Sequence, residues 1–355
     1  MLKRLRSVFL ISSSIILVVL LCMSCSEPAA TTTSATGATT EPTASPTIKT
    51  KILRFAVPLP ANDPMVESEM QIAEEFNAAA EGRYKIEMYP GGVLGSMSEA
   101  FELTMAGAID ICDMGMSSAS SKDSRFSAQS LPFQVKDFNA SQKFYDLIRD
   151  AIWQDVLRED FNVELMSLSS GNAYQYLGNE PIYTMEDWKG KVIWVANSTE
   201  AEIVKALGGS GTVLDWSDGP SAMEKGVVDG ALRPGVAAAM FKWEMLSYAT
   251  RCNFTFSSIA IAMNADVFNS MPSDLQEVLV EAFKRHEQRQ IEYWGNMEVS
   301  PYEDLAADGW EIYDLPADER AKWMDATQPI IDEYYSHLDP SDAEIIKGIF
   351  IEANK

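Results

Sequence analysis

The sequence predicts an α/β fold in which helices cover the faces of a parallel or mixed β-sheet. Two observations support this prediction. Residues 51–112 alternate between short apolar runs, which are typical of strands, and longer runs whose apolar residues recur at helical spacing. A strand–helix–strand–helix–strand order places helices against a sheet. The chain after residue 50 is long enough for one large or two moderate domains.

Each element has its own signal. An apolar run predicts a first strand at 52–59, and Asn62-Asp63-Pro64 then marks a turn and the start of a helix. Apolar residues that include Ile72 and Phe76 recur at helical spacing over 65–80. The order then continues with an alternating strand at 84–89, a proline-glycine loop at 90–95, a helix at 98–106 stopped by Gly107, and a strand at 108–112.

The N-terminus has the pattern of a targeting segment. Three basic residues, Lys3, Arg4 and Arg6, precede a short apolar core at 7–21, which is shorter than a typical transmembrane helix. Because Ser24 is a small residue directly before Cys25, we expect residues 1–25 to be a lipoprotein signal peptide with Cys25 lipidated. Ordinary secretion and a retained anchor are the alternatives. Residues 26–50 are rich in Thr, Ser, Ala and Pro and predict a disordered linker.

The charge of the chain excludes some partners. The net charge is −24, and it falls near −27 without residues 1–25, which hold three basic and no acidic side chains. Nucleic-acid binding needs clustered Lys and Arg, so we expect no nucleic-acid partner. Such a surface also argues against adsorption to an anionic membrane, and it is typical of a soluble, mutually repelling protein.

The cysteines and histidines point away from catalysis. Cys112 and Cys252 lie 140 residues apart, so we do not expect a disulfide, although an exported protein allows one. The two histidines, His286 and His337, lie in charged helical stretches and are expected at the surface. The sequence therefore offers no histidine-based metal site and no convincing Ser-His-Asp or Cys-His set. We expect no enzyme and no cofactor.

A series of short motifs runs through the chain. They are the loop 90–95, Gly107-Ala108-Ile109-Asp110, Leu131-Pro132-Phe133, the strand 191–196 after Asp187 to Gly190, the run 226–230, Met263-Asn264, the run 271–276 and Gly309-Trp310-Glu311-Ile312. Each motif is weak alone, but together, in this order, they are specific, and they cover essentially residues 51–350. In this order they resemble the solute-binding family of the TRAP transporters (tripartite ATP-independent periplasmic transporters).

The resemblance implies a periplasmic-binding-protein-like fold with two α/β lobes around a ligand cleft. The lobes are joined by crossing segments. Carried over to this chain, lobe one is 51–171 plus 259–299, and lobe two is 172–258 plus 300–355. The long helix after Pro272, running to about Met297, is expected to brace both lobes.

The resemblance also places a ligand site, and this chain departs from it. The family's carboxylate-binding arginine corresponds to Trp194, and a second arginine corresponds to Ala173. Arg233 stands where the family often has an asparagine, and Leu232 where it has a glutamate. Our hypothesis is that Arg233 relocates the anion anchor while Trp194 stacks on the solute. The alternatives are a core tryptophan and a rim arginine paired with an acid.

Further candidates come from loops at strand ends, where open α/β sheets bind ligands. For each of them ordinary packing is an equal alternative. They are Asn62, Met116, Ser117, Phe133, Tyr174, Tyr176, Asp215, Trp216 and Phe256.

These observations together predict an extracytoplasmic, lipid-anchored receptor in the periplasm or on the outer face of the cytoplasmic membrane. It is expected to capture a small organic solute by lobe closure and deliver it to TRAP membrane permease subunits. An organic acid is favoured, and an aromatic or otherwise atypical one is left open. The alternative is a lipoprotein that senses a solute and signals to a partner without transport. An enzyme on the same scaffold is a third, disfavoured reading.

Overall fold

A computed structural model describes residues 49–355. The expected signal peptide, the lipidation of Cys25 and the linker up to residue 48 lie outside the described residues. Among residues 49–355, no helix has the length and apolar character needed to cross a membrane.

The strands form two groups that share one long strand, β4, at Val163–Gly178. The first group has the order β2-β1-β3-β9-β4, in which β9 is antiparallel to both of its neighbours. Its other strands are β1 Lys51–Ala56, β2 Tyr84–Tyr89, β3 Ile111–Met114 and β9 Phe256–Asn264. The predicted strands at 52–59 and 84–89 are confirmed, and the one at 108–112 lies slightly later.

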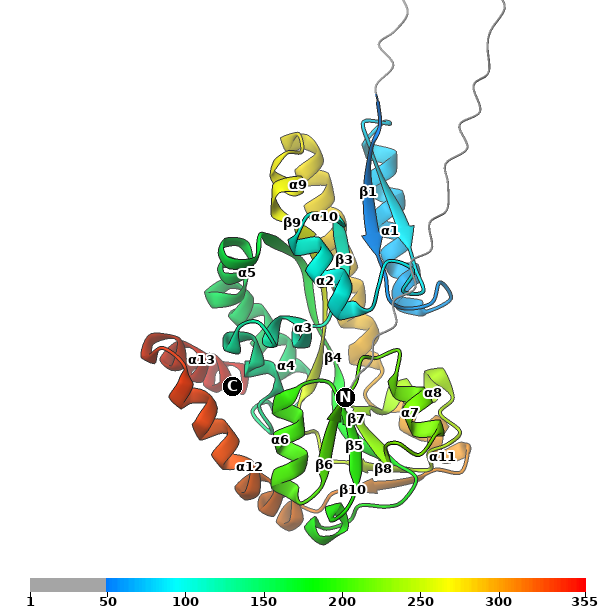
Figure 1. The fold of residues 1–355 in the computed structure, drawn as a ribbon, viewed down its shortest axis with the longest axis vertical. Helices are drawn as coiled ribbons and strands as arrows, with labels where there is room; N and C mark the ends of the chain where they lie inside the picture. Colours follow the sequence, from blue (N-terminus) through cyan, green and yellow to red (C-terminus); the bar gives the residue numbers. More distant parts are fainter. Residues whose placement is uncertain (1–48) are drawn as a thin grey trace, which may run out of the picture. The chain divides into compact units, whose positions relative to one another are not determined.

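The second group is built on the other end of β4. There β4 pairs with β7 on one edge and with β8 on the other, while β5 lies between β7 and β6. The strands of this group are β5 Val192–Val195, β6 Ser210–Val213, β7 Gly230–Pro234, β8 Tyr248–Arg251 and β10 Glu311–Asp314. Figure 1 shows β4 leading from the group of β1 and β3 to the group of β5 and β7.

Local capping starts the helices that carry the site. Asp63 accepts a hydrogen bond from the N–H of Met65 and begins α1, and Asn197 accepts one from the N–H of Glu200 and begins α6. The α-helices are α1 Pro64–Ala79, α2 Met97–Met105, α3 Met116–Ser120, α4 Phe138–Ile148, α5 Gln154–Phe161, α6 Ser198–Leu207, α7 Gly219–Glu224, α8 Gly235–Phe241, α9 Ala265–Asn269, α10 Ser273–Asn296, α11 Ser300–Ala307, α12 Ala317–His337 and α13 Pro340–Ala353. Short 3-10 turns lie at Ser124–Ser130 and Met185–Trp188, and a π-helical turn at Arg149–Trp153.

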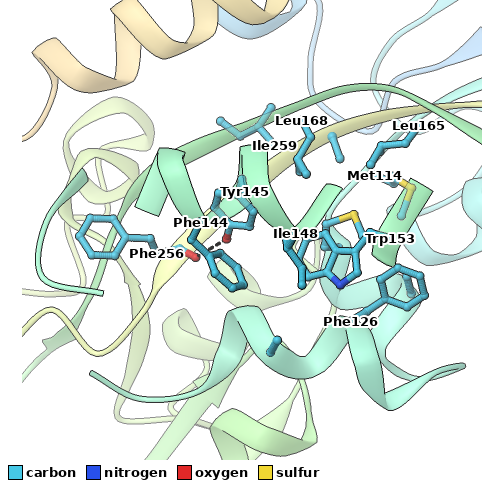
Figure 2. Packing of buried hydrophobic residues seen from close by; sticks show 14 of the residues in the cluster. Met114, Phe126, Phe144, Tyr145, Ile148, Trp153, Leu165, Leu168, Phe256 and Ile259 are labelled. Atoms are coloured by element: carbon cyan, nitrogen blue, oxygen red, sulfur yellow. Dashed lines mark hydrogen bonds between the residues drawn. The ribbon is translucent and has the colours of Figure 1, made fainter. Parts of the chain in front are cut away.

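One apolar core packs against the first strand group and fixes the backbone of Phe256 on β9. Phe126, Phe144 and Trp153 pack there against β4 and β9. The hydroxyl of Tyr145 points toward Phe256 and donates a hydrogen bond of 3.0 Å to its carbonyl oxygen (Figure 2). The backbone of Phe256 is therefore fixed from the core side of the sheet.

The long helix α10 confirms the prediction of a helix after Pro272, and it packs against α1 and β4. The C-terminal helix α13 packs against α4, where Phe350 stacks on Phe144 with ring centroids 4.5 Å apart. The sequence interpretation placed all of 300–355 in lobe two, whereas this contact brings α13 to a helix expected in lobe one. The lobe boundaries themselves stay a prediction.

One expectation about the histidines is wrong. His286 is fully buried, because it lies on the face of α10 that packs against α1, where its Nδ1 is 3.0 Å from the Ser68 hydroxyl. Burial lowers the pKa of His286 to about 3, so the ring is neutral. Cys112 and Cys252 are both buried and not joined to each other.

Candidate functional site

A cavity of about 200 Å³ lies where the loops after several strands meet. By the same measure one water molecule needs roughly 10–15 Å³, so the cavity has room for a small organic molecule. Its wall draws on both strand groups. The first group supplies Asp113 and Phe256, and the second supplies Tyr174, Trp216 and Arg233.

Six of the twelve predicted ligand residues line this cavity. They come from α3, from β4, from the loop after β6, from β7 and from β9. These residues are Ser117, Tyr174, Asp215, Trp216, Arg233 and Phe256.

The other six do not line it. Three of them pack in the apolar cores: Tyr176, Phe133 and Ala173. Met116 is buried at the start of α3, and Asn62 lies exposed in the turn before α1. Trp194 is fully buried and faces Arg233 instead of the cavity. We expected the Trp194 ring to stack on the solute, but in the structure it stacks on the guanidinium of Arg233 and does not line the cavity.

The register of two adjacent strands explains this arrangement. In the parallel pair of β5 and β7, Trp194 lies opposite Ala231. Arg233 follows Ala231 by two residues and so projects from the same face of the sheet. Its guanidinium carbon lies 4.1 Å from the centroid of the Trp194 ring, and the rings of Tyr174 and Trp216 lie 5.5 and 5.9 Å away. The guanidinium thus sits in an aromatic cage, where cation–π attraction holds it.

Arg233 is only 2 % exposed, and its charge is partly balanced. One guanidinium nitrogen, Nη1, donates to the carbonyl oxygen of Leu232 at 2.6 Å and lies 3.6 Å from Glu200 Oε2. Burial raises the pKa of Glu200, and the charge of Arg233 and hydrogen bonds from Ala196 and Asn197 oppose this. Within residues 49–355 the Nε of Arg233 has no hydrogen-bond partner.

Trp194 supports this arginine because its own position is fixed on several sides. Its Nε1 donates to the carbonyl oxygen of Leu214 at 3.0 Å, and the rings of Trp216 and Trp243 each lie 5.7 Å from it. Gly219, at the start of α7, lies against the ring: a Cβ built there would come within 2.2 Å of two ring carbons. The large residue on β5 and the glycine on α7 therefore fit together.

Replacement of Gly219 by alanine is expected to lower the free energy of unfolding by about 1–3 kcal/mol, because overpacking forces a shift of the ring or of α7. Urea denaturation of the variant and the wild type measures this difference. Gly226→Ala is the wrong control because of its positive φ, whereas Gly348→Ala, which meets nothing within 4 Å, is a suitable one. A Gly219→Ala variant as stable as Gly348→Ala would contradict the packing described.

A group of buried carboxyls comes from β3 and from α1 with its N-cap residue. Asp113 is 2 % exposed, and Asp63 and Glu69 are 4 % and 0 % exposed. Burial, and then repulsion from Asp63, raises the pKa of Asp113 to about 7. Burial also raises the pKa of Glu69, with Asp113 and Asp63 adding to the effect. In the described part of the chain, no set of three or more His, Cys, Asp or Glu residues has a geometry suited to a metal ion.

The Asp113→Asn variant is expected to be more stable than the wild type at about pH 8, and the difference should shrink toward about pH 4. Because the pKa of Asp113 is raised from 3.8 to about 7, the folded protein binds the proton more tightly than the unfolded chain. The wild type therefore loses stability as the pH rises through this window, and the amide removes that loss. Urea unfolding at several pH values measures it; a pH-independent difference would contradict the account.

Two hydrogen bonds cross between the strand groups at the edges of the cavity. The Ser98 hydroxyl donates to Asp215 Oδ1 at 3.2 Å, and the Asn197 amide donates to the Ser130 hydroxyl at 2.9 Å. They connect α2 to the loop after β6, and the start of α6 to the 3-10 turn at Ser124–Ser130. The cavity is therefore partly closed in this structure.

Sequence reasoning missed Asp113, Glu200, Asn172 and Gln129, all of which line the cavity. An aspartate inside the apolar run 108–116 was a usable signal for Asp113. Glu200 carried no such signal, since an acid in the first turn of a helix is ordinary.

The two strand groups, with a buried arginine in a cavity between them, define a two-lobed solute-binding protein. The sequence matches the family of bacterial extracellular solute-binding proteins, family 7, over residues 55–338. The chain belongs to that family.

Its relatives agree with this assignment. The C4-dicarboxylate-binding periplasmic protein of Rhodobacter capsulatus is 22% identical over 312 residues, which cover 85% of this chain and 91% of that protein. A TRAP periplasmic solute binding protein from Sulfitobacter sp. NAS-14.1 with bound β-D-galacturonate has a TM-score of 0.78 and 20% identity, covering 85% of this chain and 100% of its own. A Bordetella pertussis extracytoplasmic solute receptor binding pyroglutamic acid has a TM-score of 0.79 and 17% identity, covering 85% and 99%. These likenesses establish the fold.

Proposed function

We propose that this protein is the extracytoplasmic receptor of a TRAP-type secondary transporter and captures a small organic acid in the cavity at Arg233. The observation that carries the proposal is the arginine itself. Among the described residues that line the cavity, Arg233 has the only basic side chain, and its Nε is buried without a partner. A polar group buried in this way has a free-energy cost unless a ligand supplies the missing hydrogen bond.

The arginine is well suited to a carboxylate. A guanidinium presents its donors in a planar fork that matches the two oxygens of a carboxylate. Attraction between opposite charges is several-fold stronger in a dry cavity than in bulk water. The aromatic rings around the guanidinium hold it in one orientation, so little freedom is lost when the solute binds.

The related proteins support the choice of an organic acid. The ligands named for them, a C4-dicarboxylate, galacturonate and pyroglutamic acid, all carry a carboxyl group. The family arginine corresponds to Trp194 on β5, whereas the guanidinium of this chain comes from Arg233 on β7. The remaining groups of the solute are therefore expected to contact other side chains than in those relatives.

Lobe closure and membrane attachment complete the proposal. The solute is held where residues of both strand groups meet, so it selects the closed arrangement of the lobes. Signal peptidase cleaves before Cys25 and removes residues 1–24. The lipid on Cys25, the new N-terminal residue, and the linker 26–50 tether the receptor near its permease subunits. Mass spectrometry of the mature N-terminus tests this anchor: a diacylated Cys25 supports it, and an unmodified N-terminus at another residue contradicts it.

A thermal-shift screen of the purified protein tests the binding function. The screen compares organic acids with polyols and neutral sugars. A ligand at 100 times its dissociation constant stabilises the folded state by about 2.7 kcal/mol, which is easily measured. At least one acid is expected to raise the melting temperature. Stabilisation by neutral sugars alone would contradict the proposal.

A further inference from the structure

Resting on the proposed receptor function, we propose that the solute is a zwitterion of the amino-acid type, whose carboxylate lies at Arg233 and whose protonated nitrogen lies at Asp113.

The charge of the cavity wall does not fit a solute that is only anionic. Among the described residues, the wall holds four carboxyl side chains, those of Asp63, Asp113, Glu200 and Asp215, against the single guanidinium of Arg233. That guanidinium already has Glu200 at 3.6 Å. A second carboxylate on the solute would therefore meet like charge, whereas a cationic group on the solute would meet opposite charge.

Asp113 supplies an acceptor that the protein itself does not use. Its Oδ2 is buried and has no hydrogen-bond partner among residues 49–355, although the residue lines the cavity. Asn172, a second wall residue, has the same property at its Oδ1. Its Nδ2 donates to the carbonyl oxygen of Trp294 at 3.0 Å, which fixes the amide orientation and leaves the oxygen as the free acceptor. Donor groups on the solute would give both acceptors the hydrogen-bond partner that they lack.

The complementary donors are also present. Among the described wall residues, Arg233 Nε and Gln129 Nε2 are buried donors without a hydrogen-bond partner. Gln129 Nε2 is a donor and Asn172 Oδ1 an acceptor, and both residues line the cavity, which matches a solute with both acceptor and donor groups. A carboxylate and an ammonium group on a short carbon skeleton provide these groups.

The surroundings of Asp113 favour a positive charge on the nitrogen. Burial, and then repulsion from Asp63, raises the pKa of Asp113 to about 7, and Asp113 in turn adds to the raised pKa of the buried Glu69. A bound ammonium group relieves that repulsion and favours the ionised carboxylate. From α10 the nearby charged or titratable side chains are His286 and Arg289, which contact Ser68, and Tyr293, whose pKa is raised by burial and then by Asp63.

The test is a thermal-shift and calorimetric comparison of matched probes on the purified full-length protein. The zwitterions are glycine, L-alanine, β-alanine, γ-aminobutyrate and L-glutamine. Each is compared with the acid that lacks the amino group, and γ-aminobutyrate also with butylamine. Succinate and D-galacturonate serve as purely anionic probes. At least one zwitterion is expected to stabilise the protein and to bind at least tenfold more tightly than its matched acid.

Two variants separate the role of Asp113 from a general effect of charge. Asp113→Asn keeps the size of the side chain and is expected to abolish the preference for the zwitterion over its acid. Glu74→Gln removes a charge from the exposed face of α1, outside the cavity, and is expected to leave the preference unchanged.

Zwitterion binding by the wild type should also weaken about tenfold between about pH 8 and pH 6, because the protonated fraction of Asp113 cannot accept the ammonium group. Asp113→Asn should lose this pH dependence.

The outcomes distinguish this inference from the function on which it rests. Binding of succinate or D-galacturonate without binding of any zwitterion, or a zwitterion preference unchanged in Asp113→Asn, overturns the inference but leaves an organic-acid receptor. Absence of a shift with every probe overturns the inference and counts against the receptor function as well.

Discussion

Replacement of Arg233 by glutamine is expected to weaken binding of the solute by about 2–5 kcal/mol, a factor of roughly 30 to 4,000. The variant removes the single basic side chain among the described wall residues. It also leaves the solute's carboxylate facing the nearby carboxyl of Glu200. Isothermal titration calorimetry with a solute found in the screen measures the change.

The variant needs two controls, because the loss of Arg233 leaves Glu200 buried without its partner. The double variant Arg233→Gln with Glu200→Gln removes that uncompensated charge, so it is expected to fold stably and still bind poorly. Arg251→Gln changes a half-exposed arginine of β8 that pairs with Asp314 outside the cavity, and it should bind normally. Unchanged affinity in Arg233→Gln would mean that Arg233 is a structural arginine and not the anion anchor.

Replacement of Trp194 by alanine is expected to lower the free energy of unfolding by about 3–5 kcal/mol. The ring is fully buried among Trp216, Trp243 and the guanidinium of Arg233, so its removal leaves a large cavity in the second strand group. Urea denaturation followed by circular dichroism measures the loss. Trp310→Ala is the matched control, because that ring is only partly buried at the edge of the same core.

The expected effect on binding separates support from direct contact. If Trp194 acts by holding Arg233, Trp194→Phe, which keeps an aromatic face, should retain most of the affinity. A Trp194→Ala variant as stable as Trp310→Ala would contradict the packing. A large loss of affinity in Trp194→Phe without any loss of stability would show that the ring touches the solute.

The sequence predicted those parts of the fold whose signals are local. The apolar spacing of Ile72 and Phe76 and the start at Asp63 specify α1, and Pro272 correctly marks the start of α10. The strand β4 was not predicted as one element. Its residues include Ser169, Ser170 and Gly171, and they form a strand because partners far along the chain, β9 and β7, supply the hydrogen bonds.

The candidate site was predictable where a residue differed from the family pattern. The family pattern predicts an arginine at position 194, where this chain has tryptophan, and this chain has an arginine at position 233 instead. The strand register brings Trp194 and Arg233 together. The direction of the Trp194 side chain depends on Gly219 and Trp243, which no local pattern connects to it. The partners of Asp113 come from a helix about 45 residues earlier, so its burial with Glu69 followed only from the tertiary structure.

The most direct test of the account is a crystal structure of the protein with the solute found in the screen. The account predicts a carboxylate oxygen of the solute at roughly 2.7–2.9 Å from a guanidinium nitrogen of Arg233, with the Trp194 ring beneath the guanidinium and out of contact with the solute. A solute bound in this cavity without contact to Arg233, or bound elsewhere on the protein, would contradict the central claim that the anion anchor lies on β7.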